Sequence, residues 1–160
     1  MVFSPDPVVL TQHQPYTDTS RSPEVADTLS LTADDRQRSR GQYISDRGCT
    51  YHLHLRRGLV LRSGDRLGTP KGDYWVQILA KPEPVLTVTP LPQDAQAPLT
   101  LLKAAYHLGN RHVPLELQAT CLRLSPDSVL EQLLTQQLHV QVHQELAPFY
   151  PETGAYHHDH

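Results

Sequence analysis

The pattern of hydrophobic and polar positions divides the chain into two halves. In the first half, short apolar runs alternate with polar positions at the two-residue period of β-strands. A polar stretch over residues 12–26 and several glycine–aspartate pairs separate these runs, and such residues favour loops and tight turns. We therefore predict a small all-β domain over residues 1–84. Its strands are expected at residues 8–11, 28–32, 51–55, 60–61 and 75–79.

The second half combines strand patterns with helical periodicity. Pro98 can open a helix, residues 99–108 are apolar almost all round, and Gly109 is expected to end this buried helix in the left-handed conformation. Ser125 is expected to cap a second helix, in which leucines recur at helical spacing. With strands at residues 85–88, 113–117, 121–124 and 140–142, the order predicts a ferredoxin-like βαββαβ domain over residues 85–147. The predicted fold class is α+β, and residues 148–160 are predicted to form a flexible tail.

Composition and charge narrow the functional classes. The chain has 160 residues, of which 38% are hydrophobic and 19% charged, so it can bury a core. A net charge of −3 argues against nucleic-acid binding by phosphate neutralisation. The sequence has neither an apolar run of about 20 residues nor a recognisable targeting segment, so we expect a cytoplasmic protein without a membrane partner. Cys49 and Cys121 lie too far apart in sequence for a zinc-finger pattern.

Ten histidines are the compositional anomaly. Three of them, His157, His158 and His160, lie in the last four residues beside Asp159, and such a set suits Ni(II), Cu(II) or Zn(II). His112 follows the first predicted helix, whose carbonyl end favours a cation. From spacing alone, a ring bonded to a loop carbonyl explains His112 better, because a lone histidine is not a metal site.

The remaining histidines have plainer explanations. His107, in the last turn of the same helix, is favoured there by the helix dipole, and it stays an auxiliary candidate. His139 and His143 would share one face of the last strand, where the simpler interpretation is a polar, solvent-facing edge. The same holds for His52 and His54 in the β-domain. We retain His143 as a second auxiliary metal candidate.

The segment 104–115 strengthens the case for His112 as a metal ligand. Its sequence, Ala-Ala-Tyr-His-Leu-Gly-Asn-Arg-His-Val-Pro-Leu, closely resembles the signature of the UreE family of urease accessory metallochaperones. Supporting similarity covers most of the chain, and it includes residues 35–40, 57–58, 61–65, 82–86, 127–130 and 147–156.

The resemblance implies a non-enzymatic nickel carrier for urease maturation. Members are homodimers with an N-terminal domain that contacts partner proteins and a ferredoxin-like metal-binding domain. The residue matching His112 supplies one nickel ligand per subunit at the dimer interface, and tail histidines supplement the site. The implied partners are the urease apoprotein and its accessory proteins, especially the accessory GTPase. Cu(II) and Zn(II) are expected to compete for the site.

Two departures and three rival interpretations remain. Residues 124–128 contain none of the histidines that some relatives carry there, so we expect no auxiliary copper-type site, and the short tail predicts little nickel storage. An acylphosphatase-type enzyme would need a glycine-containing phosphate loop, but residues 89–93 lack glycine. An RNA-binding sheet would need aromatic residues on its central strands, and none are present. A protein-interaction scaffold is the more serious rival, although it gives the tail histidines no purpose.

Overall fold

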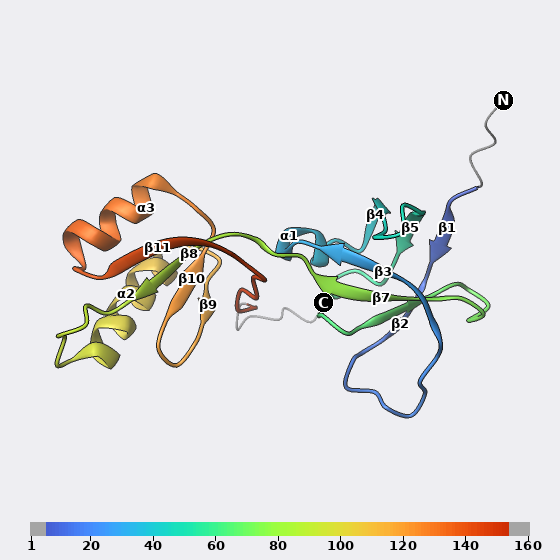
Figure 1. Cartoon of the computed structure of the whole chain (residues 1–160), viewed down its shortest axis with the longest axis horizontal. Coiled ribbons are helices and arrows are strands. Elements are labelled where there is room, and N and C mark those ends of the chain that lie inside the picture. Colours follow the sequence, from blue (N-terminus) through green and yellow to red (C-terminus); the bar gives the residue numbers. More distant parts are fainter. Residues whose placement is uncertain (1–5, 154–160) are drawn as a thin grey trace. The chain divides into compact units, whose positions relative to one another are not determined.

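A computed structural model describes residues 6–153, and its contacts divide the chain into two compact units, residues 1–81 and 82–160. Figure 1 labels their elements. The division falls at Lys81, just before the sequence Pro82-Glu83-Pro84, and the first strand of the second unit already begins at Glu83. Each unit has its own hydrophobic core.

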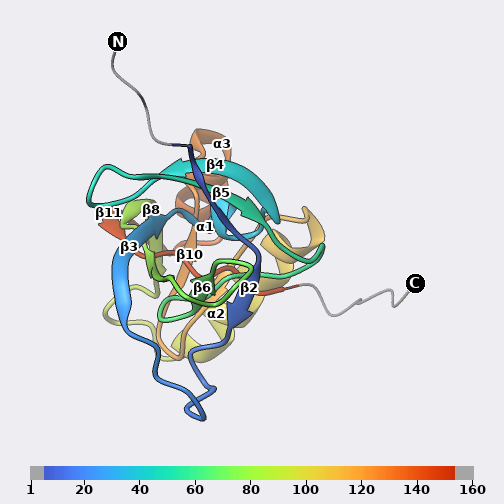
Figure 2. The same ribbon diagram turned by 90° about the vertical axis from the view of Figure 1, so that its right-hand side faces the viewer.

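The N-terminal unit consists of two sheets and a one-turn helix, α1 (Ala33–Arg36). The first sheet has the order β1-β5-β4, and its strands are β1 (Val8–Leu10), β5 (Thr50–His54) and β4 (Arg40–Ile44). The second has the order β2-β6-β7-β3, with β2 (Gln12–Gln14), β6 (Arg66–Gly68), β7 (Trp75–Ala80) and β3 (Val25–Leu31). Strands β4 and β5 run side by side in Figure 2.

Alternation along the strands builds the core of this unit. In β3, the buried side chains of Leu29 and Leu31 alternate with half-buried polar ones, and Tyr51 and Leu53 do the same in β5. Two predictions were wrong here: residues 12–14 form a strand instead of a loop, and Leu61 is buried outside any strand. Strand β4 was not predicted, and four of its five residues are exposed.

The C-terminal unit has the predicted ferredoxin-like topology. Its four-stranded sheet is antiparallel throughout and has the order β11-β8-β10-β9. Helix α2 connects β8 with β9, and α3 continues into the π-helical turn η1 before β11. The bounds are β8 (Glu83–Thr89), α2 (Ala97–Asn110), β9 (Glu116–Leu117), β10 (Leu122–Leu124), α3 (Ser128–Gln132), η1 (Leu133–Gln137) and β11 (Gln141–Ala147). The predicted α+β fold class is therefore confirmed.

Both helices pack against one face of this sheet. Leu101, Ala104 and Leu108 of α2 and Leu134 of η1 share a core cluster with the sheet residues Leu86, Val88, Leu122 and Leu124. Helix α2 is buried on this face only, because Leu102 and Tyr106 are 67% and 65% exposed. The prediction of a helix buried almost all round was therefore wrong. Asp127, not Ser125, caps α3, and its Oδ1 accepts the N–H groups of Val129 and Leu130.

The chain after β11 is held against the sheet as far as Glu152. Phe149 is 2% exposed, and the backbone N–H of Glu152 donates to the carbonyl of Leu115 over 2.8 Å. A flexible tail from Pro148 onward was therefore the wrong expectation for residues 148–152. Within the described part of the chain, no helix is long and apolar enough to cross a membrane.

Candidate metal centre

His112 occupies the corner at which α2 ends. The backbone N–H of His112 donates to the carbonyl of Gly109 (2.9 Å), and that of Val113 donates to the carbonyl of Leu108 (3.2 Å). These two bonds form a Schellman motif, which satisfies the last carbonyls of a helix. Val113 packs against the cluster that contains Leu108, and this contact completes the motif.

The left-handed residue of this motif is His112, not Gly109. Its φ is 56°, whereas Gly109 lies within the helix and is not among the residues with positive φ. Glycine normally takes this position because a Cβ there crowds the backbone. The prediction of a left-handed Gly109 was wrong, and the imidazole of His112 stands on a constrained, exposed corner instead.

The neighbouring residues close the end of the helix and differ in exposure. The guanidinium of Arg111 donates through Nη1 to the carbonyl of His107 over 3.1 Å. His107 itself is half-buried, and its ring meets the edge of Tyr106 with centroids 5.4 Å apart. His107 therefore has a packing role beside an aromatic ring, and His112 is the more accessible imidazole of the two.

An apolar stripe lies along the solvent side of α2. Leu99, Leu102 and Tyr106 follow one another at helical spacing, and all three are exposed, Leu99 to 45%. Exposed apolar residues that form such a stripe mark a surface for association. The stripe, defined by these three residues, ends six residues before His112.

Among the described residues, neither His143 nor His139 joins His112. His143 lies in β11, and β11 and β9 are the opposite edges of the sheet, so His143 and the corner before β9 are far apart within one chain. His139 precedes β11 with a φ of 52°, so His139 and His143 do not share a strand face as predicted. His157, His158 and His160 lie outside the described residues.

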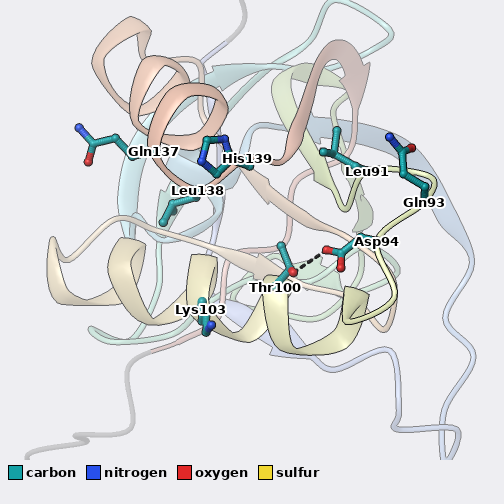
Figure 3. Close-up of a pocket in the computed structure, with 8 residues that line it drawn as sticks. All are labelled: Leu91, Gln93, Asp94, Thr100, Lys103, Gln137, Leu138 and His139. Carbon is teal, nitrogen blue, oxygen red and sulfur yellow. Dashed lines mark hydrogen bonds between the residues drawn. The ribbon is translucent and has the colours of Figure 1, made fainter.

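His139 lines a separate open cleft of about 470 Å³. Figure 3 shows His139 on one wall, at the end of η1, and Thr100 and Lys103 of α2 on the other. Asp94 lies at the mouth, where hydrogen bonds from the Thr100 hydroxyl and the Gln96 N–H lower the pKa of its carboxyl. The carboxylate of Asp94 thus already serves the entry to α2, in the manner of a capping residue.

A polar network covers the sheet face opposite the helices. The guanidinium of Arg123 bridges Glu116 (3.5 Å) and Glu145 (3.1 Å), and Thr87 donates its hydroxyl to Glu145 (2.6 Å). The Thr87 hydroxyl, followed by Arg123 and the nearby His143, lowers the pKa of Glu145 against the opposing effect of desolvation. These carboxylates are engaged in structural bonds.

The thiols offer no ligand cluster either. Burial raises the pKa of the Cys121 thiol, which disfavours the thiolate that a metal requires. Cys49 is exposed, and both cysteines are free. Among residues 6–153, no group of three or more histidine, cysteine, aspartate or glutamate side chains lies close enough to hold a metal ion.

Sequence reasoning missed the segment that follows β11. Tyr150 donates its backbone N–H to Oε2 of the buried Glu116, and Glu152 pairs with Leu115 just after the His112 corner. No local sequence signal pointed to this contact, because Glu116 and Tyr150 lie 34 positions apart.

Together these observations define a class of protein: a two-domain α+β protein with a β-unit followed by a ferredoxin-like unit that presents a histidine at the end of its first helix. The family models narrow this class. Residues 9–80 match the N-terminal domain of the UreE urease accessory protein, and residues 83–160 match its C-terminal domain. The chain belongs to the UreE family of urease accessory proteins.

Individual relatives agree with this assignment. The urease accessory protein UreE of Nostoc punctiforme is 50% identical over 136 residues, which cover 83% of this chain and 88% of the relative. The UreE protein of Microcystis aeruginosa is 48% identical, and the match covers 91% of this chain and 88% of the relative. The UreE protein of Pseudomonas putida is 42% identical, and the match covers 93% of this chain and 86% of the relative. The match therefore extends over both units.

Proposed function

We propose that this urease accessory protein is a nickel metallochaperone that binds Ni(II) through His112 and delivers it for assembly of the urease active site. The observation that carries the proposal is the placement of His112. It is exposed at the end of α2 on a corner whose backbone conformation is unfavourable for any residue with a Cβ. Strained backbone positions cluster at functional sites, and here the strain coincides with an exposed imidazole at the end of the apolar stripe of α2.

We propose that the working unit is a homodimer built on the apolar stripe of α2. A two-fold pairing of two such stripes would bring the two α2 helices together and place both His112 side chains near the axis. One imidazole cannot hold a metal ion against water, whereas two imidazoles from two chains can begin a coordination shell. This arrangement would explain why one chain needs no preformed cluster.

The tail histidines His157, His158 and His160 are proposed as additional ligands that raise the coordination number. Because Glu152 bonds to Leu115, which follows His112 by only three residues, the chain leaves Glu152 close in space to the His112 corner. His107 is proposed as an auxiliary ligand only, and His143 would serve a different ion because it lies on the opposite edge of the sheet. Imidazole ligands also bind Cu(II) more tightly than Ni(II), and Zn(II) competes as well. Selectivity for Ni(II) must therefore come from which metal ions are available in the cell.

The proposed partners are the urease apoprotein and its accessory proteins, above all the accessory GTPase. The proposed compartment is the cytoplasm, where two free thiols such as Cys49 and Cys121 stay reduced. Delivery requires release, and a shell made of a few imidazoles from separate chain segments releases its ion more easily than a closed cage.

Calorimetric titration of Ni(II) into the purified protein tests the proposal. Three proteins are compared: the wild type, His112→Ala and a chain ending at Tyr156. We expect His112→Ala to remove the tight site, and the shortened chain to bind with lower affinity or stoichiometry. Light scattering on the same samples measures the dimer. Unchanged nickel binding in His112→Ala would refute the role of His112 and would favour the interaction-scaffold alternative.

A further inference from the structure

The segment after β11 crosses from one edge of the C-terminal sheet to the other. Strand β11, which ends at Ala147, and β9 are the two edge strands. Because neighbouring strands lie about 4.8 Å apart, three spacings separate the edges by about 14 Å. Five residues after Ala147, the N–H of Glu152 bonds to the carbonyl of Leu115 beside β9 over 2.8 Å.

The buried carboxylate of Glu116 holds the middle of this crossing segment. The backbone N–H of Tyr150 donates to Oε2 of Glu116 over 2.9 Å, and Glu116 is only 6% exposed. The other carboxylate oxygen, Oε1, accepts the side-chain amide of Gln118 and faces the guanidinium of Arg123. A hydrogen bond to a charged acceptor that is itself fixed and shielded from water is stronger than one to a neutral group.

The crossing decides where the histidine tail begins. Leu115 follows His112 by three residues, so the two lie within about 10 Å along the chain. His157 follows Glu152 by five residues, a reach of about 18 Å at full extension. If both hydrogen bonds were released, the buried Phe149 would still hold the chain, and the tail would start there, eight residues before His157.

We propose that Glu116 and the backbone N–H groups of Tyr150 and Glu152 form a latch that starts the histidine tail beside His112. The latch residues are positioning residues: they touch no metal, and they raise the local concentration of tail imidazoles at the nickel ligand. This inference rests on the proposed nickel-binding role of His112 and the tail.

The size of the effect follows from the length of the tether. The effective concentration of a tethered group falls roughly as the −3/2 power of the tether length. Releasing both bonds lengthens the tether from five residues to eight, counted from the buried Phe149, and the local concentration of His157 then falls about twofold.

Glu152→Pro removes the outer bond of the latch with the smallest change, because proline lacks the N–H that bonds to Leu115. Glu152→Ala is the matched control, since alanine keeps this N–H and removes only an exposed carboxylate. Glu116→Ala removes the acceptor for Tyr150, and Glu116→Gln, which keeps one carbonyl oxygen, is the conservative variant expected to rescue it. Each variant is made in the full chain and in the chain ending at Tyr156.

Nickel affinity is measured by competition with a chelator, and amide hydrogen exchange of Tyr150 and Glu152 is measured without metal. We expect Glu152→Pro to move the start of the tail to Tyr150, seven residues before His157, and to weaken nickel binding about 1.7-fold in the full chain, with no effect in the chain ending at Tyr156. Glu116→Ala combined with Glu152→Pro should weaken it about twofold, and Glu116→Ala should remove the amide protection of Tyr150. Glu152→Ala should match the wild type in both measurements.

Two results would overturn the latch while leaving the proposed function intact: equal nickel affinity of Glu152→Pro and Glu152→Ala in the full chain, or an equal loss in the shortened chain. The second result would mean that the substitution acts on the fold and not through the tail. Failure of the proposed function would look different, because wild type and His112→Ala would then bind nickel equally, whatever the state of the latch.

Discussion

Replacing His112 by glycine should stabilise the C-terminal unit while it removes the proposed nickel ligand. The left-handed conformation of His112, with its φ of 56°, costs a residue with a Cβ about 1–2 kcal/mol. Glycine avoids this cost but loses about 0.5–1 kcal/mol more backbone entropy on folding. The two hydrogen bonds of the Schellman motif use backbone atoms only, so both survive the substitution. The net expectation is a gain of about 0.5–1 kcal/mol.

His112→Ala is the matched comparison, because alanine also removes the imidazole but keeps the Cβ and therefore the strain. Urea unfolding followed by circular dichroism, with a chelator present, gives the free energy of unfolding of each variant. Trp75, the only tryptophan, lies in the N-terminal unit, and its fluorescence follows that unit separately. A gain of 0.5–1 kcal/mol corresponds to a rise in Tm of about 2–8 °C for a unit of this size.

The result that would refute the reasoning is a glycine variant no more stable than the alanine variant. Equal stability would mean that the backbone at residue 112 carries no strain in solution. Both variants should lose tight nickel binding, so that stability and metal binding change in opposite directions for glycine alone.

Three further predictions follow from other parts of the molecule. His139→Gly should also raise the free energy of unfolding by about 0.5–1 kcal/mol, because His139 is left-handed as well, but calorimetry should find its nickel binding unchanged. Leu102→Glu, on the apolar stripe, should shift the protein from dimer to monomer in light scattering and lower nickel affinity; a persistent dimer would contradict the proposed interface. Asp65→Asn should destabilise the N-terminal unit by about 2–3 kcal/mol near neutral pH, measured by Trp75 fluorescence in urea. Burial alone would raise the pKa of Asp65, but hydrogen bonds from His13 and from the Arg62 and Tyr16 N–H groups lower it. The stabilisation by Asp65 is therefore full above its unfolded-state pKa of about 4 and is lost as the pH falls through the lower folded-state value, so the two proteins should converge in acid.

The topology of the C-terminal unit could be predicted because each of its signals is local. Helical spacing of apolar residues and the order of strand and helix patterns suffice for a ferredoxin-like arrangement, as the sheet order β11-β8-β10-β9 confirms. Strand β4 could not be found in this way. Its residues are mostly exposed, and it is a strand because it pairs with β5, which is a tertiary interaction with no periodic signal of its own.

The ends of the helices were less predictable than their middles. Glycine is the common left-handed residue after a helix, so Gly109 was the natural choice. The helix instead continues through Asn110, and the left-handed turn falls on His112. Likewise, Asp127 rather than Ser125 caps α3, because the carboxylate reaches the N–H groups of Val129 and Leu130. Several residues near a helix end can satisfy the same backbone groups, and packing decides among them.

The candidate site depends on a fact that no local pattern contains. Residues 148–152 look like a proline-rich tail in sequence, but the burial of Phe149 and the bonds to Glu116 and to the carbonyl of Leu115 bring them across the sheet. The partners lie more than thirty positions apart along the chain, so neither periodicity nor propensity connects them. The resemblance to UreE singled out His112 as the proposed ligand, but it could not have placed the start of the tail.

Two left-handed histidines in one small unit pose a question about how strain relates to function. His112 and His139 both end a helical segment with positive φ, at a position where glycine would be less costly. Strain alone therefore does not single out His112. Two features distinguish His112. The apolar stripe of α2 leads toward it, and the proposed latch bonds to Leu115, three residues after His112. His139 instead lines a cleft whose carboxylate, Asp94, already accepts a hydrogen bond from Thr100 of α2. If His139→Gly stabilises the fold without affecting nickel, the combination of strain with two converging chain segments, and not strain by itself, is the signature of the metal site.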